Sequence, residues 1–94
     1  MPDYSKGKIY QIVSHQTDQV YIGSTTQPLN VRMAEHRRIF KRYLDGKFPF
    51  ITSFHILKYD DAKIELIEDC PCDRKEQLLK REGELIRERH CVLS

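Results

Sequence analysis

Two segments near the start of the chain favour β-strands, because they combine β-branched and aromatic residues with a rough alternation of apolar and polar positions. They cover residues 8–14 and 19–24, and the stretch between them is polar and turn-like. Two strands joined by a short polar turn predict an antiparallel hairpin. The register of such a hairpin can bring Tyr10 and Tyr21 close together. A phenol beside a phosphate can donate or accept a hydrogen bond, so these two side chains are the first candidates for chemistry.

The next region has the period of an amphipathic helix. The helix should begin around Pro28, with a preceding threonine accepting its first amide bonds, and should end at Asp45-Gly46. We expect its stripe of three- and four-residue steps to face the core. The stripe consists of Leu29, Met33, His36, Phe40 and Tyr43/Leu44.

The second half of the chain predicts a short helix at residues 52–57, a third strand at residues 63–69 and a long final helix. Asp73 and Glu76 have the spacing of a capping box, which opens a helix that should run to about His90. We therefore expect residues 1–94 to form a single α+β domain.

The final helix carries an acid on its apolar stripe. Leu78, Leu79, Leu85 and Ile86 define the stripe, and Glu82 lies on it. A buried carboxylate is costly unless it is paired or binds a cation, so Glu82 requires a partner. The long first helix offers Arg32 and His36, which are one turn apart. The sequence leaves two partners possible for Glu82: an ion pair with Arg32, or a bound metal ion.

Composition limits the class of protein. Ninety-four residues suffice for one core but not for an additional DNA-reading domain. No apolar run is long enough to cross a bilayer, and no signal peptide is recognisable. An odd number of cysteines, three, favours free thiols and an intracellular, reducing compartment over a disulfide framework.

Charge is distributed unevenly. Residues 1–59 contain nine Lys/Arg against four Asp/Glu, a net charge of +5, whereas residues 60–94 contain seven against ten, a net charge of −3. The positive excess could attract a polyanion or could simply be a solvated helix face. It is concentrated in Arg32, Arg37, Arg38, Lys41, Arg42 and Lys47.

Five separated features of the chain resemble the GIY-YIG nuclease family. They are Lys8-Ile9-Tyr10, Tyr21-Ile22-Gly23, Arg32, His36 and Glu82, in this order and spacing. The resemblance runs from about residue 7 to the end. It implies a three-stranded antiparallel sheet flanked by helices and metal-dependent hydrolysis of DNA phosphodiester bonds.

The resemblance also implies a role for each polar residue. Glu82 would hold one Mg²⁺ or Mn²⁺ ion, and Arg32 would donate to the scissile phosphate. Tyr10 would activate the attacking water, with Arg32 and His36 lowering its pKa by their positive charge. Tyr21 would position the water or phosphate, and His36 would orient Tyr10 or accept its proton.

Two departures from the family pattern stand out. Lys8 occupies the position of the glycine that names the first motif, and we interpret it as neutral or as a phosphate contact. The family commonly has an asparagine about a dozen residues beyond the metal-binding acid, whereas Leu93 and Ser94 stand there. Either the chain has been cut short, or the role is dispensable, or His90 substitutes for the asparagine.

DNA is the expected partner, and Lys41, Arg42 and Lys47 are the candidates for tracking its backbone. Cleavage of both strands would need a homodimer or two encounters, because one site cuts one strand. The alternative function is a catalytically inactive nucleic-acid-binding module of the same fold.

A zinc site is disfavoured. Its candidate ligands would be Cys70, Cys72, His90 and Cys91. One residue between the first two cysteines is short for a zinc knuckle.

Overall fold

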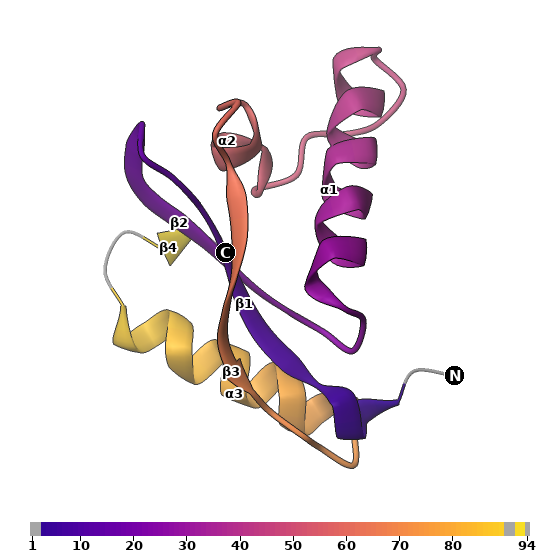
Figure 1. Ribbon diagram of the computed structural model, residues 1–94, viewed down its shortest axis with the longest axis vertical. Coiled ribbons are helices and arrows are strands. Elements are labelled where there is room, and N and C mark those ends of the chain that lie inside the picture. Colours follow the sequence, from indigo (N-terminus) through magenta and orange to yellow (C-terminus); the bar gives the residue numbers. More distant parts are fainter. Residues whose placement is uncertain (1–2, 90–91, 94) are drawn as a thin grey trace.

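The computed structural model describes residues 3–89 and 92–93, which contain a mixed sheet and three helices (Figure 1). The sheet has the order β3-β1-β2-β4. Central strand β1 pairs antiparallel with both β2 and β3, while the short β4 pairs parallel with β2. The strands are β1 (Lys8–Ser14), β2 (Thr17–Thr25), β3 (Lys63–Asp69) and β4 (Val92–Leu93). The helices are α1 (Leu29–Leu44), α2 (Phe54–Leu57) and α3 (Lys75–Glu88), and a 3₁₀ turn (Tyr4–Lys6) precedes β1.

The predicted three-stranded antiparallel sheet is confirmed, and β4 adds a short fourth strand at its edge. β4 pairs only with Val20 and Tyr21. Among the described strands, the last residues of β2 therefore have no partner on the side away from β1.

The two faces of the sheet bury separate apolar clusters. Successive residues of β1 point to opposite faces, so Ile9 packs with Leu78 and Leu85 of α3, whereas Tyr10 and Ile12 pack against α1 and α2. Figure 1 accordingly shows α1 and α2 on one side of the sheet and α3 on the other. The sheet is thus covered on both sides, which is why every residue of β1 is buried or half-buried.

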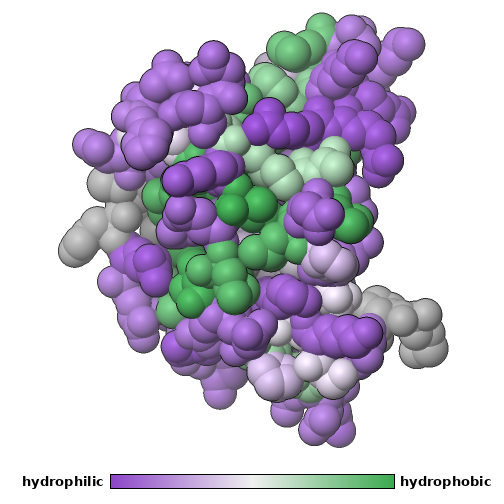
Figure 2. All heavy atoms as spheres, viewed as in Figure 1, coloured by the Kyte–Doolittle hydropathy of each residue, from purple (hydrophilic) through white to green (hydrophobic). Residues whose placement is uncertain are grey.

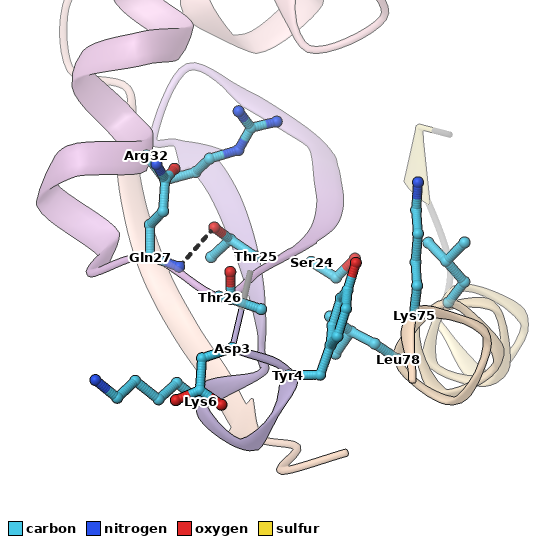
Figure 3. A pocket seen from close by; sticks show the side chains of 11 residues that line it. Asp3, Tyr4, Lys6, Ser24, Thr25, Thr26, Gln27, Arg32, Lys75 and Leu78 are labelled. Carbon is cyan, nitrogen blue, oxygen red and sulfur yellow. Dashed lines mark hydrogen bonds between the residues drawn. The ribbon is translucent and has the colours of Figure 1, made fainter. Parts of the chain in front are cut away.

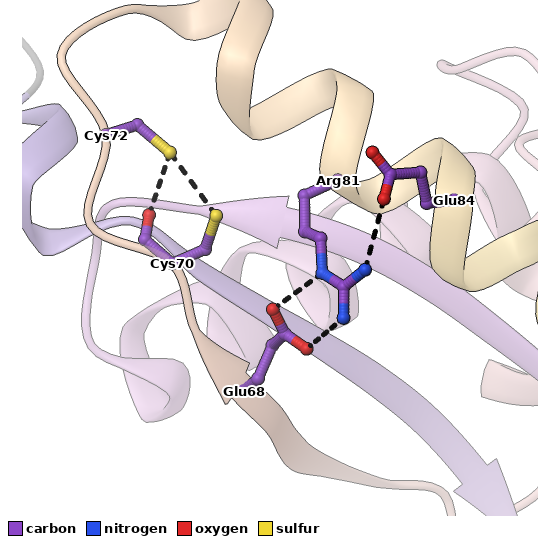
Figure 4. A network of polar contacts seen from close by, with 5 residues as sticks. All are labelled: Glu68, Cys70, Cys72, Arg81 and Glu84. Atoms are coloured by element: carbon purple, nitrogen blue, oxygen red, sulfur yellow. Dashed lines mark hydrogen bonds and ion pairs between the residues drawn. The ribbon is translucent and has the colours of Figure 1, made fainter.

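A bidentate ion pair connects α3 to edge strand β3 (Figure 4). The Arg81 guanidinium donates to both carboxylate oxygens of Glu68, at 2.8 and 2.9 Å, and to Glu84 at 3.2 Å. Bidentate geometry restricts orientation more than a single contact does. This pair orients the helix that carries Glu82.

The ends of the helices differ from the sequence prediction in detail. The predicted capping box had Asp73 as the N-cap and Glu76 three residues later. In the structure the N-cap is Arg74, one residue later, so Gln77 accepts the hydrogen bonds from the backbone amides of Asp73 and Arg74. At the start of α1, the Thr25 hydroxyl accepts from the Gln27 amide instead of capping the helix.

The short helix α2 begins two residues after the predicted start, and α3 ends at Glu88. Two leucines expected on apolar stripes are exposed, Leu44 at 67% and Leu79 at 45%.

The surface is mostly hydrophilic, but apolar residues reach it near the middle of the face shown in Figure 2. Leu66 of edge strand β3 is among the exposed large apolar residues. In the described part of the chain, no helix is long and apolar enough to cross a membrane.

Cys70 and Cys72 are free thiols, as predicted, with 3.3 Å between their sulfurs (Figure 4). The other residues of the zinc interpretation, His90 and Cys91, lie outside the described residues, as does the predicted substitution of His90 for the asparagine.

Candidate active site

The hydroxyl of Tyr10 is the centre of a buried hydrogen-bonded chain. Tyr10 is fully buried on β1. Its hydroxyl lies 2.8 Å from Nε2 of His36, and Nε of Arg32 donates to the same oxygen at 3.3 Å. Both partners come from α1, where four-residue spacing places them on adjacent turns.

The order of donors along this chain follows from the chemistry of each group. A guanidinium can only donate, so the Tyr10 oxygen accepts from Arg32 and its own hydrogen is free to point at Nε2 of His36. Nε2 is then the acceptor, and the neutral ring carries its hydrogen on Nδ1. Nδ1 lies 3.4 Å from the hydroxyl of Ser53, a fully buried residue just before α2.

His36 is neutral at physiological pH. Burial, reinforced by the nearby positive charge of Arg32, lowers its pKa to about 4. The ring is therefore a hydrogen-bond acceptor for Tyr10 and is not a source of positive charge. It also packs edge-on against both tyrosine rings, with centroid distances of 5.9 Å to Tyr10 and 5.7 Å to Tyr21.

Tyr21 lies on β2 opposite Ile12 and therefore diagonal to Tyr10, so the two tyrosines are close together as the hairpin predicted. Their ring centroids are 6.4 Å apart. Burial raises the pKa of Tyr21, and the negative charge of Glu82 raises it further. The two phenols therefore share one polar region with His36, in which Tyr10 and His36 are buried and Tyr21 is half-buried.

Gly23 makes room for the Tyr10 hydroxyl. It is the cross-strand partner of Tyr10. A Cβ atom at Gly23 would lie 2.5 Å from the Tyr10 hydroxyl oxygen and 3.1 Å from the Tyr21 ring. Real Cβ atoms do not approach so closely, so any side chain here would displace a tyrosine that His36 and Arg32 hold in place.

Glu82 reaches this region from α3. Its carboxylate is half-buried; burial raises its pKa, and a hydrogen bond from the Ser24 side chain partly offsets the effect. Its charge raises the pKa of both Tyr10 and Tyr21, so it lies within electrostatic range of both phenols. Arg32 instead forms its ion pair with Glu35, at 2.9 Å, so the alternative of a structural Glu82–Arg32 pair is wrong.

The sequence model of the GIY-YIG catalytic domain matches residues 6–90. The chain belongs to the GIY-YIG family. Two solved structures are similar to it, both of the catalytic domain of the intron-encoded homing endonuclease I-TevI. One is 26% identical with a TM-score of 0.62 and covers 88% of this chain and 87% of the other. The second, a point mutant, is 25% identical with a TM-score of 0.60 and covers 88% and 82%. No curated protein matches the sequence significantly.

The protein is thus a GIY-YIG-type endonuclease, and its fold brings the motif residues into one region. Tyr10, Arg32 and His36 are joined by hydrogen bonds, while Tyr21 and Glu82 lie beside them. These are the five positions that the resemblance singled out. Their catalytic roles remain predictions.

The predicted depression of the Tyr10 pKa is wrong for this GIY-YIG domain. Burial raises the pKa of Tyr10 to about 12, and the Arg32 charge and hydrogen bond only partly oppose this. Sequence spacing indicated the positive neighbours but could not show that the hydroxyl is fully enclosed, nor that His36 is neutral. Tyr10 therefore keeps its proton in the absence of substrate.

The basic residues predicted to bind substrate are not all near the site. Lys41 and Arg42 lie at the opposite end of α1 from Arg32, and Lys47 follows the helix. Lys41, nine residues after Arg32, is about 14 Å further along the helix axis. The Arg42 guanidinium lies 5.7 Å from the centre of the Phe48 ring. Lys8 donates to the carbonyl of Lys6 at the start of the sheet. Their contact with substrate stays a prediction.

Ser53 was missed by the sequence analysis of the site. It lies within the predicted short helix, and no spacing or motif distinguished it. A buried hydroxyl requires a hydrogen-bond partner, and His36 supplies one. The useful signal would have been a small polar residue flanked by apolar ones in a segment expected to be buried.

The low pKa of His36 predicts that the free energy of unfolding depends on pH. An unfolded chain would take up a proton near pH 6.5, whereas folded His36 does so only near 4. Stability is therefore complete above about pH 6.5 and falls as the pH is lowered towards 4. We expect a loss of about 2 kcal/mol between roughly pH 7.5 and pH 5, measured by urea unfolding.

His36→Gln is the control, because it removes the titrating ring and should flatten this slope. Arg32 and Glu35 are the charged groups that act on His36, and Arg32 stays charged throughout this window. The pKa of Glu35 is lowered from an ordinary value of 4.5, so its stability contribution is also lost in acid, but mainly below about pH 5. Glu82, with its raised pKa, acts in the opposite direction in acid. An equal slope in the two proteins would show that His36 is not buried in the neutral form.

Proposed function

We propose that this endonuclease hydrolyses phosphodiester bonds of DNA with one divalent cation, Mg²⁺ or Mn²⁺. The observation that carries the proposal is the Tyr10 hydroxyl, held between the Nε atom of Arg32 and the Nε2 atom of neutral His36. This arrangement fixes one lone pair and the hydrogen of the phenol and leaves its second lone pair free to accept a proton. DNA as the substrate also agrees with the endonuclease name of the I-TevI structures.

Glu82 has the properties of a residue that binds a hydrated cation. Its carboxylate has a raised pKa and forms no ion pair with the described residues, so a cation would relieve an existing electrostatic cost. The described residues contain no cluster of three or more metal-ligating side chains. A single carboxylate suits Mg²⁺, which keeps several waters and shares phosphate oxygens. When bound, the cation supplies charge neutralisation at the leaving oxygen.

Tyr10 and His36 can move a proton together. Tyr10 is fully buried in the free protein, so the step requires that substrate binding brings the attacking water to its oxygen. As the water gives a proton to that oxygen, Tyr10 can pass its own proton to Nε2 of His36. No free phenolate is required, which accommodates a pKa of about 12. The negative charge of a bound phosphate would raise the pKa of His36 and so make it a better acceptor.

Arg32 is positioned to contact the phosphate under attack. Its Nε donates to Tyr10 and its Nη1 to Glu35. Its Nη2 atom makes no hydrogen bond to the described residues and can donate to a phosphate oxygen. Donors held in place before the reaction stabilise charge that develops in the transition state.

The test is nicking of supercoiled plasmid by the purified protein in Mg²⁺, in Mn²⁺ and in EDTA. We expect the open-circular form to appear with either metal and to disappear with the chelator. DNA binding without nicking under any metal would favour the inactive nucleic-acid-binding module. The ratio of open-circular to linear product shows whether two copies of the protein act together, since simultaneous cleavage of both strands needs a second copy on the DNA.

A further inference from the structure

A cleft of about 640 Å³ opens next to the candidate active site (Figure 3). Its walls come from three separate parts of the chain: the N-terminal 3₁₀ turn, the end of β2 with the loop into α1, and the first two turns of α3. No sequence motif spans these segments, so the cleft was not predicted.

The cleft adjoins the catalytic region because the two share residues. Arg32, which contacts Tyr10, forms part of its wall. So does Ser24, whose side chain is near enough to Glu82 to lower the pKa of its carboxyl. A DNA strand whose phosphate lies at Arg32 can therefore continue directly into this space.

The lining combines positive charge with apolar surface. Lys75 and Arg32 contribute cations, while Tyr4, Leu78 and Leu79 contribute an apolar wall. Leu79 is 45% exposed although it was expected on a buried stripe, so part of this wall is available to a ligand. The one acid among the described residues of the lining, Asp3, accepts hydrogen bonds from the backbone amide and the hydroxyl of Ser5. A nucleotide offers a matching combination of anionic phosphate and weakly polar sugar and base.

Figure 3 distinguishes the two lysines of the lining. The Lys75 side chain rises from α3 on the same side as the Arg32 guanidinium, whereas Lys6 extends away from the other side chains. Lys75 is therefore the better candidate for a phosphate contact.

We propose that this cleft binds the nucleotides that adjoin the cleaved bond, with Lys75 on a flanking phosphate and Tyr4 and Leu79 against sugar or base. The inference rests on the proposed function for its choice of ligand. It places the DNA strand across the start of α3, and not along the basic end of α1.

Binding of a fluorescent DNA duplex in EDTA, measured by anisotropy over a series of salt concentrations, tests this placement without cleavage. Lys75→Gln should weaken binding at low salt by about fivefold and should reduce the salt slope by about one unit, as expected for one lost phosphate contact. Lys80→Gln is the matched control on the same helix, because Lys80 is exposed and does not line the cleft. Lys47→Gln represents the basic end of α1.

The proposal would be overturned if Lys75→Gln had the same salt slope as Lys80→Gln. It would also be overturned if only Lys47→Gln weakened DNA binding. In steady-state nicking, Lys75→Gln should raise KM with kcat nearly unchanged. The binding measurement also separates this inference from the proposed function. A protein that never nicks DNA but binds it through Lys75 would refute the catalytic proposal and retain the cleft.

Discussion

Tyr10→Phe is expected to reduce DNA nicking by about 10³-fold while leaving DNA binding intact. Proton transfer by a positioned group typically contributes 10²- to 10⁴-fold, which sets this magnitude. The substitution keeps the ring that packs against Tyr21 and His36 but removes the oxygen on which Arg32 and His36 converge. Single-turnover nicking with enzyme in excess over plasmid measures the chemical step directly.

Tyr43→Phe is the matched control for this prediction. Tyr43 packs among Phe40, Phe50 and Phe54, and its hydroxyl has no hydrogen bond to the described residues. It should nick at the rate of the unmodified protein. Loss of the two hydrogen bonds at Tyr10 should also lower the free energy of unfolding by about 1–3 kcal/mol, so thermal unfolding must confirm that the Phe variant is folded. A folded Tyr10→Phe protein that nicks at the normal rate would exclude Tyr10 from the reaction.

Glu82→Gln is expected to reduce nicking by about 10³-fold and to leave the protein as stable as before or more stable. The variant keeps the shape of the side chain but loses the charge that would hold the cation. Charge stabilisation by a metal is worth several kcal/mol, and each 1.4 kcal/mol is a factor of about ten in rate. Because burial raises the pKa of Glu82, its ionised form is disfavoured in the folded protein, so neutralising it should not lower the melting temperature.

Glu88→Gln, at the exposed end of the same helix, is the control and should nick normally. Nicking and thermal unfolding should be measured on the same preparations across a range of Mg²⁺ concentrations. Activity that persists in Glu82→Gln would refute the assignment of the metal to this residue. Lost activity with a large fall in melting temperature would instead indicate a structural role.

The sequence predicted regular elements well where their periodicity was strong. The bounds of β1 and β3 agree with prediction to the residue, and α1 lies between the predicted entry at Pro28 and the predicted stop at Asp45-Gly46. Alternation in the strands and a long apolar stripe in the helix each allow one register. Helix caps were less predictable. The path of the chain after β3 decides whether Glu76 or Gln77 accepts the hydrogen bonds of the backbone amides before α3. No local sequence pattern encodes that path.

The composition of the site was predictable, but its electrostatics were not. The spacing of the family motif identified Tyr10, Arg32, His36 and Glu82, and the apolar stripes placed His36 and Glu82 on the inward faces of their helices. Burial of the Tyr10 hydroxyl depends on how α1 and α2 pack over the sheet, and that burial decides the sign of its pKa shift. The nucleotide cleft depends on three distant segments and is visible only in three dimensions.

Tyr10 of the first triplet, residues 8–10, depends sterically on Gly23 of the second triplet, residues 21–23. The Tyr10 phenol occupies the space that a side chain at position 23 would fill, so neither triplet can be redesigned alone. Engineering a different base at position 10 would have to begin with the volume available at position 23. Transplanting this hairpin into another scaffold would likewise succeed only if the glycine and the tyrosine moved together in the same pairing.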